Sequence, residues 1–335
     1  MFKLKKIIIF GGAGYCGSVL VPQLLEIGWD VTVYDNFWYG TDQFPKSTKL
    51  HLIKGDVRDL SKASEACKGQ DSVLHLACIS NDASFELDEE LSTSVNLNAF
   101  EPIVIAAKQA GVKRFIFASS SSVYGVSDSP EVTEDHPLVP LTLYNKYKGM
   151  CEPLLLKHTD KNFVGVIFRP ATVCGYSPRQ RLDLSVNILT NHAINKGKIL
   201  VFGGEQLRPN LHIQDYADLC KLLLIAPDKK IANQIFNVGF DNMSIMAIAR
   251  SVKKIVEEVF PEKKDIPIEV TSSDDPRSYH INSDKIRRIL GFQPKYSVDD
   301  AVRDLCKAFR EGLLPNSFDD NRYFNVRTMK AIDAK

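Results

Sequence analysis

The chain has 335 residues, 44% of them hydrophobic, and a formal net charge of +1 at pH 7. This length and apolar content suffice for one large α/β core with a second, smaller lobe, and the near-neutral charge argues against nucleic acid as the main partner. The seven cysteines form no C-x-x-C pair and the seven histidines no H-E-x-x-H motif, so we expect no metal site and no disulfide framework.

The chain begins Met-Phe-Lys-Leu-Lys-Lys and continues directly into a strand-like apolar run. A signal peptide or a membrane span would require a longer apolar segment than the sequence contains. We therefore expect a cytoplasmic protein without a membrane partner.

A glycine-rich turn follows this first strand and opens a helical pattern that extends to about Gly28. Gly11, Gly14 and Gly17, together with Gly12, satisfy both the G-x-G-x-x-G and the G-x-x-G-x-x-G spacing. Glycine lets the backbone approach a pyrophosphate, which then lies on the N-terminus of the helix. The order strand, glycine turn, helix predicts a dinucleotide site.

The second strand pattern ends at Asp35, roughly 20 residues beyond the glycine turn, where a carboxylate accepts hydrogen bonds from an adenosine ribose. No arginine immediately follows Asp35 to bind a 2′-phosphate, so the sequence favours NAD over NADP. The alternative is that Asp35 is a surface acid after a buried strand.

Further strand patterns at 51–54, 72–76, 114–118 and 163–168 alternate with helical stretches, including 92–110. Alternating strands and helices predict an α/β fold with a Rossmann-type, doubly wound parallel sheet. In such sheets the ligand binds at the carboxyl ends of the strands.

Tyr144 and Lys148 are four residues apart, so a helix would place them on one face. A tyrosine hydroxyl has a pKa near ~10 and becomes a base only beside positive charge, such as this lysine and an oxidised nicotinamide ring. The same spacing also occurs on ordinary solvated helix faces. Pro153 predicts either a kink just beyond the pair or the end of the helix before the proline.

Taken in order, these pieces resemble the extended short-chain dehydrogenase/reductase family, in particular its NAD-dependent nucleotide-sugar epimerase and dehydratase branch, which includes UDP-galactose 4-epimerase-like proteins. The resemblance covers nearly the whole chain. The matching segments are Gly-Gly-Ala-Gly-Tyr-Cys-Gly (11–17), Asp35, Gly-Asp-Val-Arg-Asp (55–59), His-Leu-Ala-Cys (75–78), Val-Asn (95–96), Ser-Ser-Ser-Ser-Val-Tyr-Gly (119–125), Tyr144 with Lys148, and Arg-Pro (169–170).

The resemblance implies that the glycine turn holds the pyrophosphate of NAD, that Asp35 binds the adenosine ribose, and that Lys148 holds the nicotinamide ribose and tunes Tyr144. The cofactor-binding residues that it implies are Gly11, Gly14, Tyr15, Cys16, Gly17, Asp35, Asn36, Asp56, Val57, Leu76, Ala77, Asn96, Tyr144, Lys148 and Pro170.

The resemblance also implies a catalytic role for Ser120, counted back from the Val-Tyr-Gly at 123–125. Its hydroxyl would position the reacting sugar hydroxyl beside the Tyr144 phenolate. Alternatively, the serine run is a polar loop that satisfies backbone groups. Sugar 4,6-dehydratases carry Asp and Glu at the next two positions, where this chain has Ser121 and Ser122, so we disfavour dehydration.

After about residue 171 the alternation gives way to segments rich in Pro, Arg and turn residues. There the resemblance implies two arginines, Arg208 and Arg277, that clamp the diphosphate of a nucleotide sugar. Solvation of a loop explains Ser80 and Asn81 equally well, Phe202 could instead be a buried strand aromatic, and Thr172 stands where several relatives carry asparagine. The implied substrate-binding residues are Ser80, Asn81, Thr172, Asn187, Phe202, Arg208 and Arg277.

We therefore expect an NAD-binding Rossmann domain at 1–170 with returns near 211–240, a smaller nucleotide-sugar-binding lobe at 171–210 and 241–320, and a tail at 321–335. An amphipathic helix is expected at 298–310, with a capping box formed by Ser297 and Asp300.

The leading hypothesis is an NAD-dependent nucleotide-sugar epimerase that oxidises its substrate at C4 and returns the hydride. A nucleotide-sugar dehydrogenase or keto-sugar reductase would use the same residues, and a non-catalytic NAD-sensing protein is a third possibility. The resemblance implies a homodimer formed through helices 92–110 and 144–158, although their apolar residues could as easily pack within the monomer.

Overall fold

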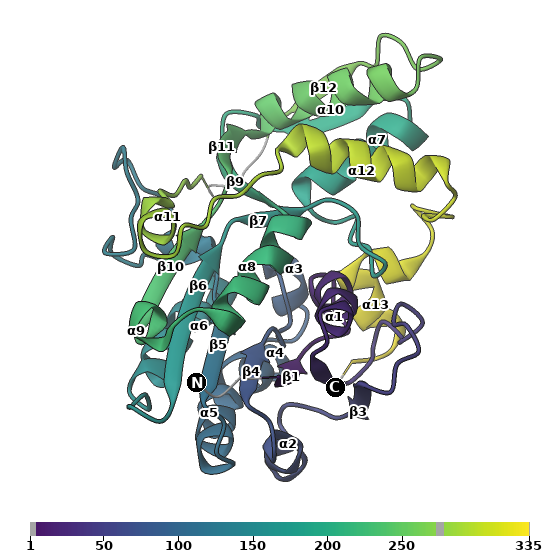
Figure 1. Ribbon diagram of the computed structural model, residues 1–335. Helices are drawn as coiled ribbons and strands as arrows, with labels where there is room; N and C mark the ends of the chain where they lie inside the picture. The colour runs from purple at the N-terminus through teal and green to yellow at the C-terminus, as the bar shows by residue number, and fades with distance from the viewer. Residues whose placement is uncertain (1–4, 273–277, 335) are drawn as a thin grey trace.

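The structure is a computed structural model that describes residues 5–272 and 278–334. Its centre is a seven-stranded sheet of order β10-β6-β5-β4-β1-β2-β3, in which every neighbouring pair is parallel (Figure 1). The chain starts inside the sheet and winds outward in both directions, which confirms the predicted doubly wound α/β fold. The strands are β1 (Lys6–Phe10), β2 (Asp30–Asp35), β3 (Leu50–Lys54), β4 (Ser72–His75), β5 (Arg114–Ala118), β6 (Val164–Pro170) and β10 (Gln234–Val238).

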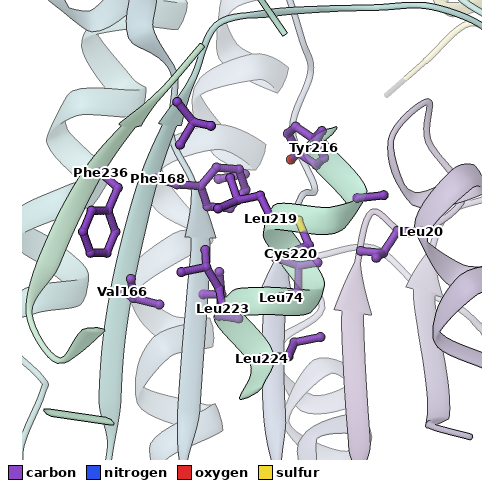
Figure 2. Close-up of a cluster of buried hydrophobic side chains, with 14 of the residues drawn as sticks. Leu20, Leu74, Val166, Phe168, Tyr216, Leu219, Cys220, Leu223, Leu224 and Phe236 are labelled. Carbon is purple, nitrogen blue, oxygen red and sulfur yellow. The ribbon is translucent and has the colours of Figure 1, made fainter. Parts of the chain in front are cut away.

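Alternate side chains of the strands fill one hydrophobic layer on each face of this sheet. In β1, Ile7 and Ile9 belong to one layer, and Ile8 and Phe10 to the other. The first layer lies under α1 (Gly17–Glu26) and α8 (Ile213–Ile225), and the second under α2 (Leu60–Cys67), α5 (Phe100–Gln109) and α6 (Leu143–Leu156). Figure 2 shows the first layer, where side chains of α8 point at the strands. Burial on both faces explains why these strands read as nearly continuous apolar runs.

A second core lies beyond the carboxyl ends of the parallel strands (Figure 1). It contains a three-stranded sheet, β11-β9-β7, and a two-stranded sheet, β12-β8. Its elements are β7 (Thr172–Cys174), α7 (Ser185–Asn195), β8 (Ile199–Phe202), β9 (Leu207–His212), β11 (Asp241–Ser244), α10 (Ile245–Val259), β12 (Ile268–Thr271) and α12 (Val298–Arg310). The predicted helix 298–310 and its Ser297/Asp300 capping box are confirmed. We retain the predicted domain boundary at residue 170 as a proposal.

The helix predicted at 92–110 is wrong in one respect, because three elements occupy this stretch. These are α4 (Glu89–Thr93), a π-helical segment η1 (Ser94–Asn98) and α5. The irregular turn has a tertiary cause, since Asn96 turns its side-chain amide to the loop after β4, accepting from Ile79 N (2.8 Å) and donating to Ile79 O (2.9 Å).

Helix α6 passes through Pro153, so the interpretation that it ends before the proline is wrong. It begins after Thr142, whose Oγ1 accepts a hydrogen bond from the backbone N of Asn145 (3.3 Å). Tyr144 and Lys148 therefore lie in its first turns, before the proline. The remaining elements are α3 (Asp82–Phe85), η2 (Ser121–Tyr124), α9 (Asp228–Ile231), α11 (Asp284–Leu290), η3 (Asn321–Tyr323) and α13 (Asn325–Ala331).

None of the helices in the described part of the chain combines the length and apolar character that crossing a membrane requires.

Candidate active site

A cavity of about 960 Å³ lies between the two cores, at the carboxyl ends of the parallel strands. Its wall includes the glycine turn, the ends of β2, β4 and β5, and the first turns of α6. The opposite part of the wall comes from β7, the loop before α7, β8 and β9. This is where a doubly wound sheet binds its ligands.

The glycine turn has room for backbone only at two of its positions. A Cβ at Gly11, where φ is +76°, would lie 2.5 Å from the Cα of Ala77, and one at Gly17 would lie 2.2 Å from the carbonyl oxygen of Gly12. At Gly14 the nearest atom would be the Gly11 carbonyl oxygen at 3.3 Å, and this residue lines the cavity. The turn thus presents bare backbone at the N-terminus of α1, which fits a pyrophosphate.

Asp35 joins the end of β2 to the glycine turn. Its carboxylate accepts hydrogen bonds from Ala13 N (3.0 Å) and Phe37 N (2.8 Å), and it also lines the cavity. Burial raises the pKa of this carboxyl, while the two backbone donors act in the opposite direction. A fixed carboxylate beside the turn fits a ribose with free hydroxyls.

Lys148 is buried and donates from Nζ to the carbonyl oxygen of Ala118 (2.8 Å) at the end of β5. Ser120 follows β5, and its Oγ lies 2.7 Å from Ser122 Oγ. Ser122 Oγ in turn donates to Asn145 Oδ1 on α6. A hydrogen-bond chain therefore ties the serine turn to the helix that carries Tyr144, and Ser120, Tyr144 and Lys148 all line the cavity.

Burial raises the pKa of Tyr144 well above its usual value, and the nearby Cys78 and Asp82 raise it further. Arg181 acts in the opposite direction but does not outweigh burial. Tyr144 is therefore a neutral phenol in the protein alone. A further positive charge is needed before it can act as a base at neutral pH.

Residues 7–239 match the sequence model of the NAD dependent epimerase/dehydratase family. The chain belongs to this family. Its cofactor is NAD, for which the bare glycine turn and Asp35 form a fitting site.

Among curated relatives, UDP-glucose 4-epimerase of Lactobacillus helveticus is 28% identical over 322 residues, which cover 89% of this chain and 94% of the relative. UDP-N-acetyl-alpha-D-glucosaminuronate decarboxylase of Bacillus cytotoxicus is 27% identical, covering 92% of this chain and 98% of that protein. The solved structure of MoeE5 in complex with UDP-glucuronic acid and NAD is 25% identical, with a TM-score of 0.78 over 92% of this chain and 99% of that one.

Most residues that the family pattern implied lie on the cavity wall. The implied cofactor residues found there are Gly11, Gly14, Tyr15, Cys16, Gly17, Asp35, Asn36, Asp56, Val57, Leu76, Ala77, Tyr144, Lys148 and Pro170, and the implied substrate residues are Ser80, Asn81, Thr172, Phe202 and Arg208. Phe202 is 59% exposed, so the interpretation as a buried strand aromatic is wrong. Arg277 lies outside the described residues.

Two implied residues, Asn96 and Asn187, do not line the cavity. Asn96 holds the loop after β4, as described above. Asn187 accepts from Gly175 N (3.0 Å) and donates to the hydroxyl of Tyr15 (3.1 Å) and to Arg181 O (2.8 Å). Both asparagines position loops that form the wall.

Sequence reasoning missed several residues on the wall. Two of them, Arg179 and Arg181, stood out only as part of a turn rich in Pro and Arg, and the segment containing Asn325 had no motif. The missed residues are Tyr39, Thr142, Asn145, Arg179, Arg181, Asp183 and Asn325. Within the described residues, no group of three or more His, Cys, Asp or Glu could hold a metal ion.

Proposed function

We propose that this protein is a nucleotide-sugar epimerase that inverts a hydroxyl-bearing carbon of the sugar, C4, by transient oxidation with resident NAD. The observation that carries the proposal is the hydrogen-bonded serine turn beside Tyr144 and Lys148, in the same cavity as the glycine turn. The UDP-glucose 4-epimerase of L. helveticus, similar over nearly all of its length, supports the same reaction class.

In this proposal Tyr144 takes the proton of the sugar hydroxyl and later gives it back. NAD, when bound, accepts and returns a hydride. Its oxidised ring also places a positive charge beside Tyr144, which the phenol needs in order to lose its proton. Lys148 is fixed by Ala118 and directs its ammonium group into the same region. Ser120, held by Ser122, hydrogen-bonds the reacting oxygen beside the phenol.

Dehydration is disfavoured because no acid follows Ser120. Ser121 is buried, and the Ser122 hydroxyl is engaged with Ser120 and Asn145. Elimination of water requires a group that removes a proton from one carbon and another that protonates the leaving hydroxyl. Neither serine supplies a titratable carboxyl for those roles.

The second lobe is proposed to bind the nucleotide diphosphate. Phe202 exposes its ring at the cavity, where it can stack on a base. Arg208 lies with its guanidinium carbon 5.4 Å from the ring centre of Tyr279, and both residues line the cavity. MoeE5 binds UDP-glucuronic acid, and several relatives are UDP-glucose 4-epimerases, so UDP-hexoses and UDP-hexuronic acids are the first substrates to test.

The test is incubation of the purified protein with each UDP-sugar without added cofactor. We expect the C4 epimer to form and a deuterium label at C4 to be retained, because the hydride returns to the molecule that lost it. Net oxidation or reduction that requires added cofactor would instead identify the dehydrogenase or reductase. Binding of NAD without any turnover of the panel would favour the non-catalytic alternative.

Tyr144→Phe should reduce turnover roughly 100-fold or more while the purified protein still contains NAD. Tyr147→Phe is the matched control, because Tyr147 lies on the same helix and packs against Phe85 (5.5 Å between ring centres). Unchanged turnover in Tyr144→Phe would remove the proposed mechanism.

A homodimer through α5 and α6 remains part of the proposal. Each helix exposes a large apolar side chain, Ile105 at 36% and Met150 at 42%. Sedimentation equilibrium tests it, and a monomer at micromolar concentration would contradict it.

A further inference from the structure

Arg179 lies on the cavity wall but has no role in the proposal above. Its side chain is buried, with 6% of the residue exposed. Its Nη2 donates to Asn325 Oδ1 (2.6 Å), and its guanidinium carbon lies 3.5 Å from the ring centre of Tyr39. Its Nε is buried and has no hydrogen-bond partner.

Among the described residues no carboxylate lies within ion-pair distance of Arg179, although Asp183 acts on its charge from further away. The neighbouring Asp183 is engaged by Arg181, which donates from Nε to Oδ1 (2.9 Å) and from Nη2 to Oδ2 (3.1 Å). Two buried arginines therefore share one carboxylate. Burying two cations against one carboxylate is costly, so the arrangement is suited to an anion brought by a ligand.

The position of Arg179 indicates which anion. Tyr39, which its guanidinium covers, follows Asp35 by four residues and lines the cavity. Burial raises the pKa of the Asp35 carboxyl and that of the Cys16 thiol, and the positive charge of Arg179 acts in the opposite direction on both groups. Arg179 is thus close to both the ribose carboxylate and the glycine turn, and the diphosphate of a dinucleotide lies between these two features.

We propose that Arg179 binds a phosphate of the cofactor diphosphate, and that Asn325 on the C-terminal helix α13 positions it for this contact. The glycine turn offers backbone N–H groups and the N-terminus of α1 but no side-chain cation. The planar fork of arginine supplies that charge with two parallel donors. The proposal rests on the cofactor site and is independent of the reaction that follows.

The C-terminal helix then becomes part of the cofactor site. Asn325 also donates from Nδ2 to Ser80 Oγ (2.8 Å) and from its backbone N to Asp183 Oδ2 (3.3 Å). Four residues further on, Met329 packs against Ile79 in the loop after β4 and against Leu91 in α4. These contacts hold α13 (yellow in Figure 1) over one end of the cavity, where it would slow the release of a cofactor.

The test compares ADP with adenosine as probes of the full-length protein after removal of bound nucleotide, by isothermal titration calorimetry. Arg179→Met should weaken the affinity for ADP roughly 10- to 100-fold, the loss expected for a hydrogen bond to a charged group. The affinity for adenosine should not change. The exposed Arg322→Met is the matched control and should change neither. The melting temperature of Arg179→Met without ligand should not fall, because the variant removes an unpaired buried charge.

Four results would overturn the proposal. An equal loss for ADP and adenosine, or a lower melting temperature with ADP affinity unchanged, would assign Arg179 a structural role. A loss of affinity confined to UDP would show that Arg179 binds the diphosphate of the substrate instead. A loss of affinity confined to NADP would show that Arg179 binds a phosphate at the 2′-position of the ribose.

The positioning role of Asn325 has a separate readout. Asn325→Ala should speed dissociation of NAD, followed by cofactor fluorescence after dilution, and should add little further effect in the Arg179→Met background, because the two act as one unit. Additive effects would contradict positioning through Arg179. If Arg179→Met does not fold, the same comparison is made with Arg179→Lys and Asn325→Ala. Each variant must weaken the binding of ADP more than the binding of adenosine.

Discussion

Replacing Glu152 with glutamine is expected to destabilise the protein by about 3–5 kcal/mol, because the change leaves Arg169 as an unpaired cation in the interior. Two bonds join the pair, from Arg169 Nε to Oε1 (2.9 Å) and from Nη2 to Oε2 (2.6 Å). The two side chains are only 4% and 3% exposed, so water cannot replace the missing charge.

This ion pair also supports the serine turn. Glu152 Oε1 accepts a hydrogen bond from Ser119 Oγ (2.6 Å), and Arg169 Nη1 donates to the hydroxyl of Tyr124 (2.6 Å). Ser119 precedes Ser120, and Tyr124 ends η2. The pair therefore fixes both ends of the turn, and we expect turnover in Glu152→Gln to fall at temperatures where most of the protein is still folded.

The assay is urea denaturation of the protein without nucleotide, because a bound ligand would add its own stabilisation. The control is the double variant Glu152→Leu/Arg169→Met, which replaces both charges by apolar groups of similar size and should lose less than Glu152→Gln alone. The reasoning is refuted if the double variant is the less stable of the two, or if Glu152→Gln costs less than about 1 kcal/mol.

Three further predictions concern single residues. Burial, aided by the charge of Lys148, lowers the pKa of His75 to about 3; because that pKa lies below the unfolded value, stability is lost as pH falls from about 6.5 toward 3, at up to about 1.4 kcal/mol per pH unit. In His75→Phe, the free energy of unfolding measured by urea denaturation should fall less between pH 7 and pH 4 than in the wild type. An equal fall in both proteins would contradict a lowered pKa of His75. Asn81 has φ +71° and ψ 159°, a conformation that is essentially restricted to glycine, so Asn81→Gly should be more stable than Asn81→Ala by about 1–3 kcal/mol, and equal melting temperatures would count against strain there. Burial raises the pKa of Tyr144, so the difference in absorbance at 295 nm between the wild type and Tyr144→Phe should appear only above about pH 10 without cofactor. With NAD it should appear at lower pH. A phenolate signal at pH 8 without cofactor would contradict the inference that Tyr144 is neutral in the protein alone.

The features that sequence reasoning predicted are those whose cause is local. The spacing of the glycine turn is visible in the chain, and Gly17 must be glycine because a Cβ there would meet Gly12 of the same turn, although Gly11 is also confined by the distant Ala77. Tyr144 and Lys148 share a helix face through a four-residue spacing alone. The apolar runs of the parallel strands are equally visible, and their predicted limits agree with the structure to within one or two residues.

The features that it missed depend on contacts between distant segments. The π-helical turn at 94–98 exists because Asn96 reaches across to Ile79. Arg179 meets its partner Asn325 across 146 positions of the chain, and no spacing rule connects two such residues. The same is true of Arg181, which acts on Tyr144 from a loop of the second lobe, whereas a helical spacing pointed only to Lys148.

In the proposed reaction, the charges around Tyr144 tie proton transfer to hydride transfer. Arg181, a nearby cation that favours the phenolate, forms an ion pair with Asp183, and burial still keeps the pKa of Tyr144 high. Tyr144 can thus lose its proton only while a second positive charge stands beside it, and oxidised NAD brings that charge. Once the charge has gone, burial again favours the neutral phenol, so in this proposal Tyr144 would hold the proton that the sugar oxygen must later recover. A more basic environment, in which protein groups alone stabilised the phenolate, would lack this dependence, and the absorbance of Tyr144 with and without NAD distinguishes the two arrangements.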